Sequence, residues 1–321
     1  EPYFGYMRGR YSQAELRELD AYANERGMTI MPCIQTLAHL YAIKRWPEYW
    51  PHFDTDDILL AGDERVYTLI DHMFRSLAAS LSCRTIHLGM DEAEMFARGR
   101  YYNQHGDCNR SQALLAHLQR VCEIGETYGF RFLIWSDMFF KLATGGQYYA
   151  QNAQIDESVR EKIPANVELV YWDYYHQDAA MYEKMIQRHR DIGFDPVMGS
   201  GIWTWTRLWY DHKKTMQTAV PCIQACRKQK VSELFFTMWG DNGAYCNYDS
   251  SLAGIIFCAD LAFGVPANDP HKETSRRFAA ICQSSYEAHL VASDIEAWDD
   301  FGVDPALMIW DDPLLGILFD D

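Results

Sequence analysis

The sequence predicts an α/β protein with the architecture of a TIM (β/α)8 barrel. Short, nearly continuous apolar runs of strand length alternate with longer amphipathic stretches, which is typical of a parallel sheet covered by helices on both faces. The glycine-rich phosphate-binding motifs that often mark an open, doubly wound sheet are missing from the sequence. Polar and aromatic residues instead gather after successive strands, where barrel proteins carry their functional sites. About six β-α units are visible in this chain.

Each expected strand is an apolar run rich in β-branched or aromatic residues, bounded by glycine or polar residues. These runs cover residues 28–34, 85–89, 130–135, 167–172, 196–203 and 234–239. Helices are expected where apolar residues recur every three or four positions. They cover residues 12–26, 63–80, 111–128, 178–190, 214–228 and 252–263. In the first helix, Ser12 and Glu15 have capping-box spacing, and Gly27 ends the helix.

The composition narrows the class of partner. The net charge of −16 argues against nucleic-acid backbones and anionic membranes as partners. No apolar run is long enough to span a membrane as a helix. Aromatic residues make up 14% of the chain, which suits a site that stacks on sugars, although a large aromatic core explains the same number.

The nine cysteines are an odd number and several lie inside apolar runs, which favours reduced thiols. Cys222 and Cys226 are four residues apart on an expected helix, but no second pair with metal spacing accompanies them, so we expect neither a metal nor a cofactor. The first residues show no signal-peptide pattern, and the chain does not begin with Met. We therefore expect a cytoplasmic protein whose N-terminus is trimmed.

Two neighbouring acids, Asp91 and Glu92, follow the expected strand 85–89 in the segment HLGMDEAE. Neighbouring residues in a strand point to opposite faces, but the chain turns at a strand end, so both carboxylates can reach one pocket. Gly89 leaves room there for a ligand or a neighbouring backbone. An acid pair at this position can instead cap a following helix, where the helix dipole favours negative charge.

The pattern H-x-G-x-D-E-A resembles the signature of family 20 glycoside hydrolases, the β-N-acetylhexosaminidases. The resemblance covers residues 1–263 as ordered segments at successive strand ends, and its wording is nearest to the bacterial, non-secreted branch. These segments are PCIQTLAH at 32–39, LIWSDM at 133–138, YWD at 171–173, WTW at 203–205 and MWGD at 238–241. In the last of them, Asp241 stands where the family has Glu.

The resemblance implies an exo-acting, retaining enzyme that releases terminal GlcNAc or GalNAc. The substrate's own acetamide oxygen is the nucleophile, and the intermediate is an oxazolinium ion. Glu92 would be the general acid/base, so its surroundings or Asp91 should raise its pKa. Asp91 would hold the acetamide N–H, and Tyr171 would donate its hydroxyl to the acetamide oxygen. The implied substrate-binding residues are His39, Trp135, Asp173, Trp203, Trp205, Trp239 and Asp241.

Geometry limits some of these roles. Trp203 and Trp205 are two residues apart, so they share a face and are both core or both pocket residues. Trp172 should point the other way from its two neighbours, toward the helix layer. A histidine at a strand end, such as His39, is often structural, and His87 is expected to pack or hydrogen-bond inside the fold.

Two other functions remain open. A non-catalytic amino-sugar-binding protein on a decayed barrel would keep the tryptophans and lose turnover. A (β/α)8 glycosidase could instead use Asp137 or Asp173 with Glu92 as a two-carboxylate pair. The expected partner is a carbohydrate with a terminal N-acetylhexosamine, with no nucleic acid and no membrane, and a homo-oligomer is compatible with the sequence.

The domain organisation follows from the strand count. Residues 1–263 are expected to form a catalytic barrel that lacks its first strands, because eight strands close such a barrel. Residues 264–321 are expected to begin a helical accessory segment, with helical patterning at 275–292. The resemblance also implies a sugar-gripping arginine on the first strand, which this chain does not show. We therefore expect a chain truncated at both ends, or a second chain that supplies the missing strands.

Overall fold

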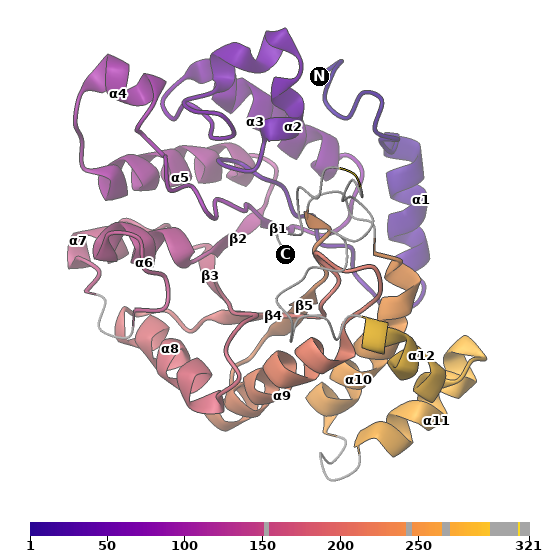
Figure 1. Cartoon of the computed structure of the whole chain (residues 1–321). Coiled ribbons are helices and arrows are strands. Elements are labelled where there is room, and N and C mark those ends of the chain that lie inside the picture. The colour runs from indigo at the N-terminus through magenta and orange to yellow at the C-terminus, as the bar shows by residue number, and fades with distance from the viewer. Residues whose placement is uncertain (151–153, 242–245, 265–269, 296–313, 315–321) are drawn as a thin grey trace. The chain divides into compact units, whose positions relative to one another are not determined.

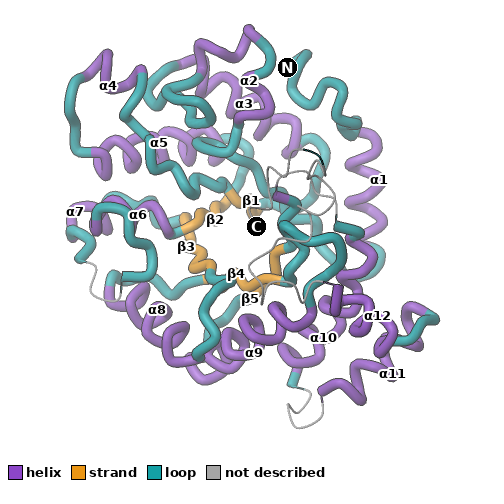
Figure 2. Tube along the Cα trace, in the orientation of Figure 1, coloured by secondary structure: helices purple, strands orange, loops and turns teal. Residues whose placement is uncertain are grey.

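A computed structural model describes residues 1–150, 154–241, 246–264, 270–295 and Leu314 (Figure 1). The chain divides into two compact units. The first unit comprises residues 1–171 and 187–197, and the second comprises residues 172–186 and 198–321. In each unit strands alternate with helices along the chain, as the sequence predicts (Figure 2).

The strands of the first unit pair in parallel and in chain order. They are β1 (Thr85–His87), β2 (Arg131–Trp135) and β3 (Val167–Trp172). Ile86 lies opposite Phe132, and Ile134 lies opposite Leu169. After its exposed first residue, β2 is buried at every position, which is expected of a parallel strand covered on both faces.

The expected strand at residues 28–34 is only partly formed, and this corrects the count of six. The segment lies extended beside β1, where the His87 N–H donates to the Pro32 carbonyl and the Ile34 N–H donates to the His87 carbonyl, both at 2.9 Å. A single bridge joins Cys33 to His87. Pro32 has no N–H to donate, which limits the ladder at this point. The described residues therefore contain five regular strands.

Most expected helices of the first unit are present. Ser12 and Glu15 form the predicted capping box at the start of α1. Asp63 caps α3, which packs against α5 and brings Phe74 onto Phe132. The helices are α1 (Gln13–Asn24), α2 (Tyr41–Lys44), α3 (Glu64–Ala78), α4 (Arg100–His105), α5 (Arg110–Glu126), α6 (Asp137–Thr144) and α7 (Glu157–Arg160), with the 3-10 helix η1 (Pro47–His52).

The second unit contains the parallel pair β4 (Val197–Gly201) and β5 (Leu234–Thr237). Its helices are α9 (His212–Gln229), α10 (Leu252–Phe263), α11 (Pro270–Cys282) and α12 (Tyr286–Ser293), with the 3-10 helix η3 (Tyr248–Ser251), and α8 (Ala179–Asp191) contributes to both units.

The core of the second unit joins residues on both sides of Gly264. Tyr210, Phe257, Phe278 and Tyr286 are all buried in one cluster. The helical pattern predicted for 275–292 is therefore confirmed by α11 and α12, and both helices contribute to this core. The boundary after residue 263 stays a prediction, and the remainder of the tail, from residue 296 onward, lies outside the described residues except for Leu314.

Two expectations from composition agree with the described part of the chain. No helix there combines the length and the apolar character needed to cross a bilayer. All nine cysteine thiols are free, and Cys122, Cys222, Cys226, Cys246 and Cys258 are buried.

Candidate active site

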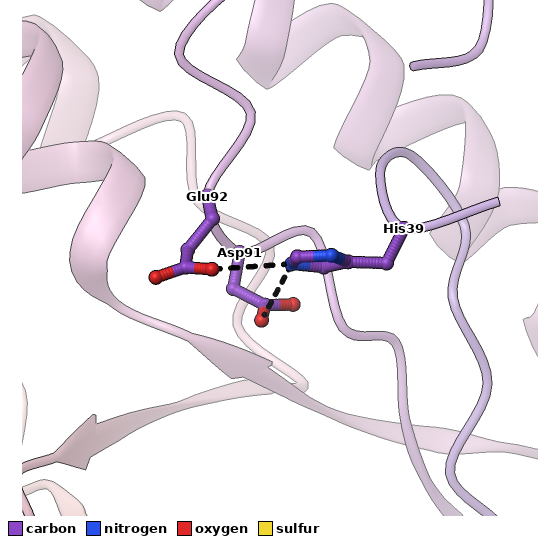
Figure 3. A group of neighbouring side chains, drawn as sticks. All are labelled: His39, Asp91 and Glu92. Carbon is purple, nitrogen blue, oxygen red and sulfur yellow. Dashed lines mark ion pairs between the residues drawn. The ribbon is translucent and has the colours of Figure 1, made fainter. Parts of the chain in front are cut away.

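Three side chains from two separate loops of the first unit meet at one point (Figure 3). Asp91 and Glu92 come from the loop after β1, and His39 comes from the loop after the segment that lies beside β1. The Nε2 atom of His39 is 3.3 Å from Oδ2 of Asp91 and 3.5 Å from Oε2 of Glu92. The structure thus places the carboxyl groups of both predicted acids next to the imidazole of His39.

Left-handed backbone produces this convergence. Met90, Glu92 and His39 have φ of 68°, 52° and 56°, and Gly89 has φ of 70°. Such a conformation costs a residue other than glycine on the order of 1–3 kcal/mol and persists only where the surroundings hold it. The next helix begins at Arg100, so Asp91 caps no helix and the capping interpretation of the acid pair is wrong.

Gln35, in the segment beside β1, holds the loop that carries Asp91 and Glu92. Its Nε2 donates to Oδ1 of Asp91 at 2.8 Å, and its Oε1 accepts the N–H of Met90 at 3.1 Å. A Cβ at Gly89 would lie 2.0 Å from Oε1 of Gln35. The space that Gly89 leaves is therefore filled by a neighbouring side chain.

The substitution Gly89→Ala should destabilise the fold by about 1–3 kcal/mol, because it adds a clash to an unfavourable φ. It should also lower activity, because Gln35 must move away from Asp91. Urea unfolding and kcat on the same preparation measure both effects. Gly62→Ala is the matched control, since Gly62 also has positive φ, at 86°, but a Cβ there meets nothing within 4 Å. Equal losses in the two variants would show that the contact with Gln35 does not require glycine.

The electrostatic environments of the two acids differ in direction. Burial raises the pKa of Asp91, but hydrogen bonds from His39 and Gln35 and the charge of His39 outweigh it, so the pKa is lowered. Burial also raises the pKa of Glu92, and Asp91 adds to the increase while Lys141 and His39 oppose it, so the pKa is raised. At neutral pH Asp91 is therefore the ionised member of the pair, and Glu92 is the member that more readily keeps a proton.

His39 is positively charged at neutral pH. Its hydrogen bond to Asp91 is the main cause that raises its pKa to about 9, against the opposing effect of burial. Ligand atoms of His39, Asp91 and Glu92 lie within 4.8 Å of one another, so the three could in principle hold a metal ion. A metal bound there would have to displace the proton of His39, because a ligating imidazole is neutral.

The other predicted residues of the first unit are buried. The Trp135 ring lies 4.3 Å from the His87 ring, centroid to centroid. His87 is structural, as predicted: its Nδ1 accepts the N–H of Gly89 at 3.0 Å, and burial lowers its pKa to about 4. Tyr171 is fully buried, with its ring centroid 5.2 Å from that of His189 and 6.2 Å from that of Tyr148.

Trp203 and Trp205 form an aromatic cluster in the second unit. Their rings stack with centroids 3.9 Å apart, and Tyr174 meets Trp205 edge-on at 5.4 Å. The two tryptophans therefore share one environment, as predicted, but they lie beyond the end of β4, so strand alternation is not the cause. Trp172, the last residue of β3, stacks on Tyr174 at 5.3 Å and so joins this cluster. Its expected direction toward the helix layer stays a prediction.

The remaining predicted residues also belong to the second unit. Trp239 is partly buried, and its carbonyl accepts from the Thr204 hydroxyl at 2.9 Å, which ties it to the segment of Trp203 and Trp205. Asp241 is exposed. Asp173 is fully buried, accepts the backbone N–H groups of residues 175 and 176, and pairs with Nδ1 of His176 at 2.7 Å.

Sequence reasoning missed three residues around Glu92 and Asp91, or gave them another role. Gln35 was overlooked, although a polar residue next to an apolar run was a usable signal. Asp137 was considered only as an alternative nucleophile, but it is fully buried, and its Oδ2 accepts the Glu92 N–H at 3.0 Å. Lys141 lies 3.2 Å from the same oxygen, at the i,i+4 spacing that a helical pair would show.

Solved structures of β-N-acetylhexosaminidases share this fold. The enzyme from Bacteroides fragilis aligns with a TM-score of 0.58 at 16% identity, covering 86% of this chain and 57% of that chain. An exo-β-N-acetylglucosaminidase from Vibrio harveyi in complex with N-acetylglucosamine aligns with a TM-score of 0.54 at 17% identity, covering 92% and 46%. At these identities the likeness establishes the fold class alone.

The family model for the catalytic domain of glycosyl hydrolase family 20 matches residues 5–192. The chain therefore belongs to glycosyl hydrolase family 20. A beta-hexosaminidase of Vibrio furnissii is 36% identical over 98 residues, which cover 26% of this chain and 16% of the relative. Hexosaminidase D of Bos taurus is 23% identical over 228 residues, which cover 64% of this chain and 58% of the relative. The chain thus spans less than two thirds of the length of either relative, and the bacterial, non-secreted branch stays a prediction.

Proposed function

We propose that this chain carries the catalytic centre of an exo-acting, retaining β-N-acetylhexosaminidase. The observation that carries the proposal is the opposite direction of the pKa shifts in two neighbouring carboxyl groups, lowered in Asp91 and raised in Glu92. Environments that separate the pKa values of two acids assign them different roles. Glu92 is therefore the better proton donor to the leaving oxygen, and Asp91 stays ionised to face a developing positive charge.

The spacing of the two acids supports retention. Their ligand oxygens lie within 4.8 Å of each other and of Nε2 of His39. Inverting glycosidases place their carboxyl groups about 6.5–9.5 Å apart to leave room for the attacking water. No such room exists between Asp91 and Glu92, which disfavours direct attack by a water and leaves Asp91 or a group of the substrate as the nucleophile.

The substrate's acetamide supplies that group in the mechanism we propose. Glu92 donates its proton to the glycosidic oxygen while the acetamide oxygen attacks the anomeric carbon and the leaving group departs. Asp91 accepts the acetamide N–H and stabilises the positive oxazolinium. Glu92 then takes a proton from the water that opens the oxazolinium, which restores the starting configuration.

The remaining proposed roles follow from the resemblance to the family. Tyr171 donates its hydroxyl to the acetamide oxygen, and His39 tunes the two acids. The substrate is a carbohydrate with a terminal N-acetylhexosamine. The proposed residues that wall the sugar or accept from its hydroxyls are Trp135, Asp173, Trp203, Trp205, Trp239 and Asp241.

Hydrolysis of chromogenic β-glycosides of GlcNAc, GalNAc and glucose, measured side by side, tests the function. The two N-acetyl sugars should be cleaved and the glucoside should react orders of magnitude more slowly, because it has no internal nucleophile. Comparable cleavage of the glucoside would favour a two-carboxylate glycosidase. Binding of GlcNAc without turnover of any glycoside would favour a non-catalytic sugar-binding protein.

A further inference from the structure

The main chain of the proposed general acid is anchored on the first residues of α6. Oδ2 of Asp137 accepts the N–H of Glu92 at 3.0 Å, and the sulfur of Met138 lies 3.2 Å from the N–H of Ala93. Asp137 is fully buried, and its Oδ1 has no hydrogen-bond partner among the described residues. Burying a carboxylate that has so few hydrogen-bond donors costs folding free energy. This cost suggests that the hydrogen bond from Glu92 to Asp137 has a functional role.

Glu92 needs such an anchor because its φ of 52° is unfavourable for a residue with a side chain. That conformation turns its carboxyl toward His39, with Oε2 3.5 Å from Nε2 of His39. A relaxed backbone at Glu92 would move the carboxyl away from the position that it shares with Asp91. By accepting the N–H of Glu92, Oδ2 of Asp137 can therefore determine where the carboxyl group of Glu92 lies.

Lys141 lies one helical turn beyond Asp137 and holds its carboxylate. The Lys141 ammonium is 3.2 Å from Oδ2 of Asp137 and also contacts Oε1 of Glu94. Burial raises the pKa of Asp137 to about 6, even though Lys141 opposes the increase. The same ammonium acts on Glu92, where it is the largest influence that opposes the effect of burial on the pKa.

Building on the function proposed above, we infer that Asp137 and Lys141 are positioning residues for Glu92. Asp137 holds the backbone of Glu92 in its left-handed conformation. Lys141 holds the carboxylate of Asp137 in place. Neither residue transfers a proton or contacts the substrate, so their loss should be seen only through what Glu92 does.

Asp137→Ala removes the acceptor for the Glu92 N–H. We expect kcat on a disaccharide with terminal β-GlcNAc to fall about 10²-fold, the scale of loss from misplacing a reacting group. The loss on a dinitrophenyl β-N-acetylglucosaminide, whose leaving group needs little protonation, should stay below about fivefold. Asp137→Asn keeps an oxygen that can accept the same N–H and should recover most of the activity.

Ser136→Ala is the matched control. Ser136 is also fully buried and precedes Asp137, but its hydroxyl contacts Tyr148 and His189 and not Glu92. Any loss in this variant should be equal on the two substrates. The inference about Asp137 is overturned if Asp137→Ala loses equally on both substrates, or if Ser136→Ala reproduces the substrate-dependent loss.

A pH profile tests Lys141 by the sign of a shift. Asp91, His39, Glu94 and Lys141 influence the pKa of Glu92, and the titratable carboxyl of Asp137 accepts its backbone N–H. The cation of Lys141 lowers the pKa of Glu92, so Lys141→Met should move the falling limb of kcat/KM to higher pH. Glu94 raises that pKa, so Glu94→Gln should move the limb to lower pH. If the falling limb of kcat/KM does not move in Lys141→Met, or moves to lower pH, the inference that Lys141 acts on Glu92 is overturned.

The experiment separates this inference from the proposed function. If the unaltered protein cleaves both glycosides and Glu92→Gln is selective for the disaccharide, while Asp137→Ala is not, the inference alone fails. If the unaltered protein cleaves neither glycoside, the proposed function fails. In that case, or if Asp137→Ala does not fold, carbon-13 NMR titration of the Glu92 carboxyl with and without Lys141→Met still decides whether Lys141 acts on Glu92.

Discussion

Glu92→Gln is expected to lower kcat on substrates with poor leaving groups by about 10²–10⁴-fold, the range that general acid catalysis contributes. At 1.36 kcal/mol for each factor of ten, this is about 2.7–5.4 kcal/mol of transition-state stabilisation. The amide keeps the size of the carboxyl but has no acidic proton. Sugar binding should survive, because the amide fills the same space. Steady-state kinetics on a natural disaccharide measure the loss, and a product-inhibition constant for GlcNAc measures the binding.

Leaving-group and pH dependence sharpen this prediction. An activated aryl glycoside should lose far less than the disaccharide, because its leaving group departs with little protonation. Activity should fall as pH rises through the pKa of Glu92, which burial holds above its ordinary value. This falling limb should vanish in Glu92→Gln. Glu94→Gln makes the same chemical change at an exposed carboxylate two residues away and, at a pH below the falling limb, should keep kcat close to that of the unaltered protein. Near-normal turnover of the disaccharide by Glu92→Gln would place the acid elsewhere.

The fold was predictable wherever an element carries its own local signal. The apolar run at β2 and the capping box at Ser12 both predict the elements that form. α6 was missed because it is only eight residues long, and periodicity cannot establish a helix over so short a segment. The composition of residues 28–34 predicts a strand. Its pairing with β1 is limited to one bridge because Pro32 has no N–H to donate, and composition does not reveal that limit.

The site was predictable only as far as the motif extends. Asp91 and Glu92 lie together in the sequence, and His39 stands at a neighbouring strand end, so their convergence could be inferred. The raised pKa of Glu92 was also expected from its role. The hydrogen bond from Gln35 to Asp91 joins residues 56 positions apart, and it depends on side-chain geometry that no local pattern encodes. For the same reason the sequence did not reveal the anchor that Asp137 provides.

Asp91→Asn is expected to lower kcat on N-acetylglucosaminides by about 10²–10³-fold, the cost of removing one preorganised electrostatic partner. Asparagine keeps the shape but cannot neutralise the oxazolinium. Loss of the Asp91 charge should also change the pKa values of Glu92 and His39. Asp91 raises the pKa of Glu92, so the falling limb of the pH profile should move to lower pH, and the pKa of His39 should fall because its main hydrogen-bond partner is neutral. Gln35→Met removes one hydrogen bond from Asp91 but leaves its charge, so it should cost much less.

The nature of the nucleophile decides between this role for Asp91 and a covalent one. If the acetamide attacks, a thiazoline mimic of the bicyclic intermediate should bind far more tightly than substrate, as transition-state-like species do. That preference should shrink in Asp91→Asn, since the mimic then lacks its anionic partner. A covalent mechanism predicts instead that a 2-fluoro sugar traps a glycosyl-enzyme on an aspartate. Asp137 is poorly placed for such an attack, because it is fully buried and its Oδ2 accepts the N–H of Glu92. A stoichiometric adduct on Asp91, Asp137 or Asp173 by mass spectrometry would exclude the acetamide mechanism and, with it, the stabilising role of Asp91.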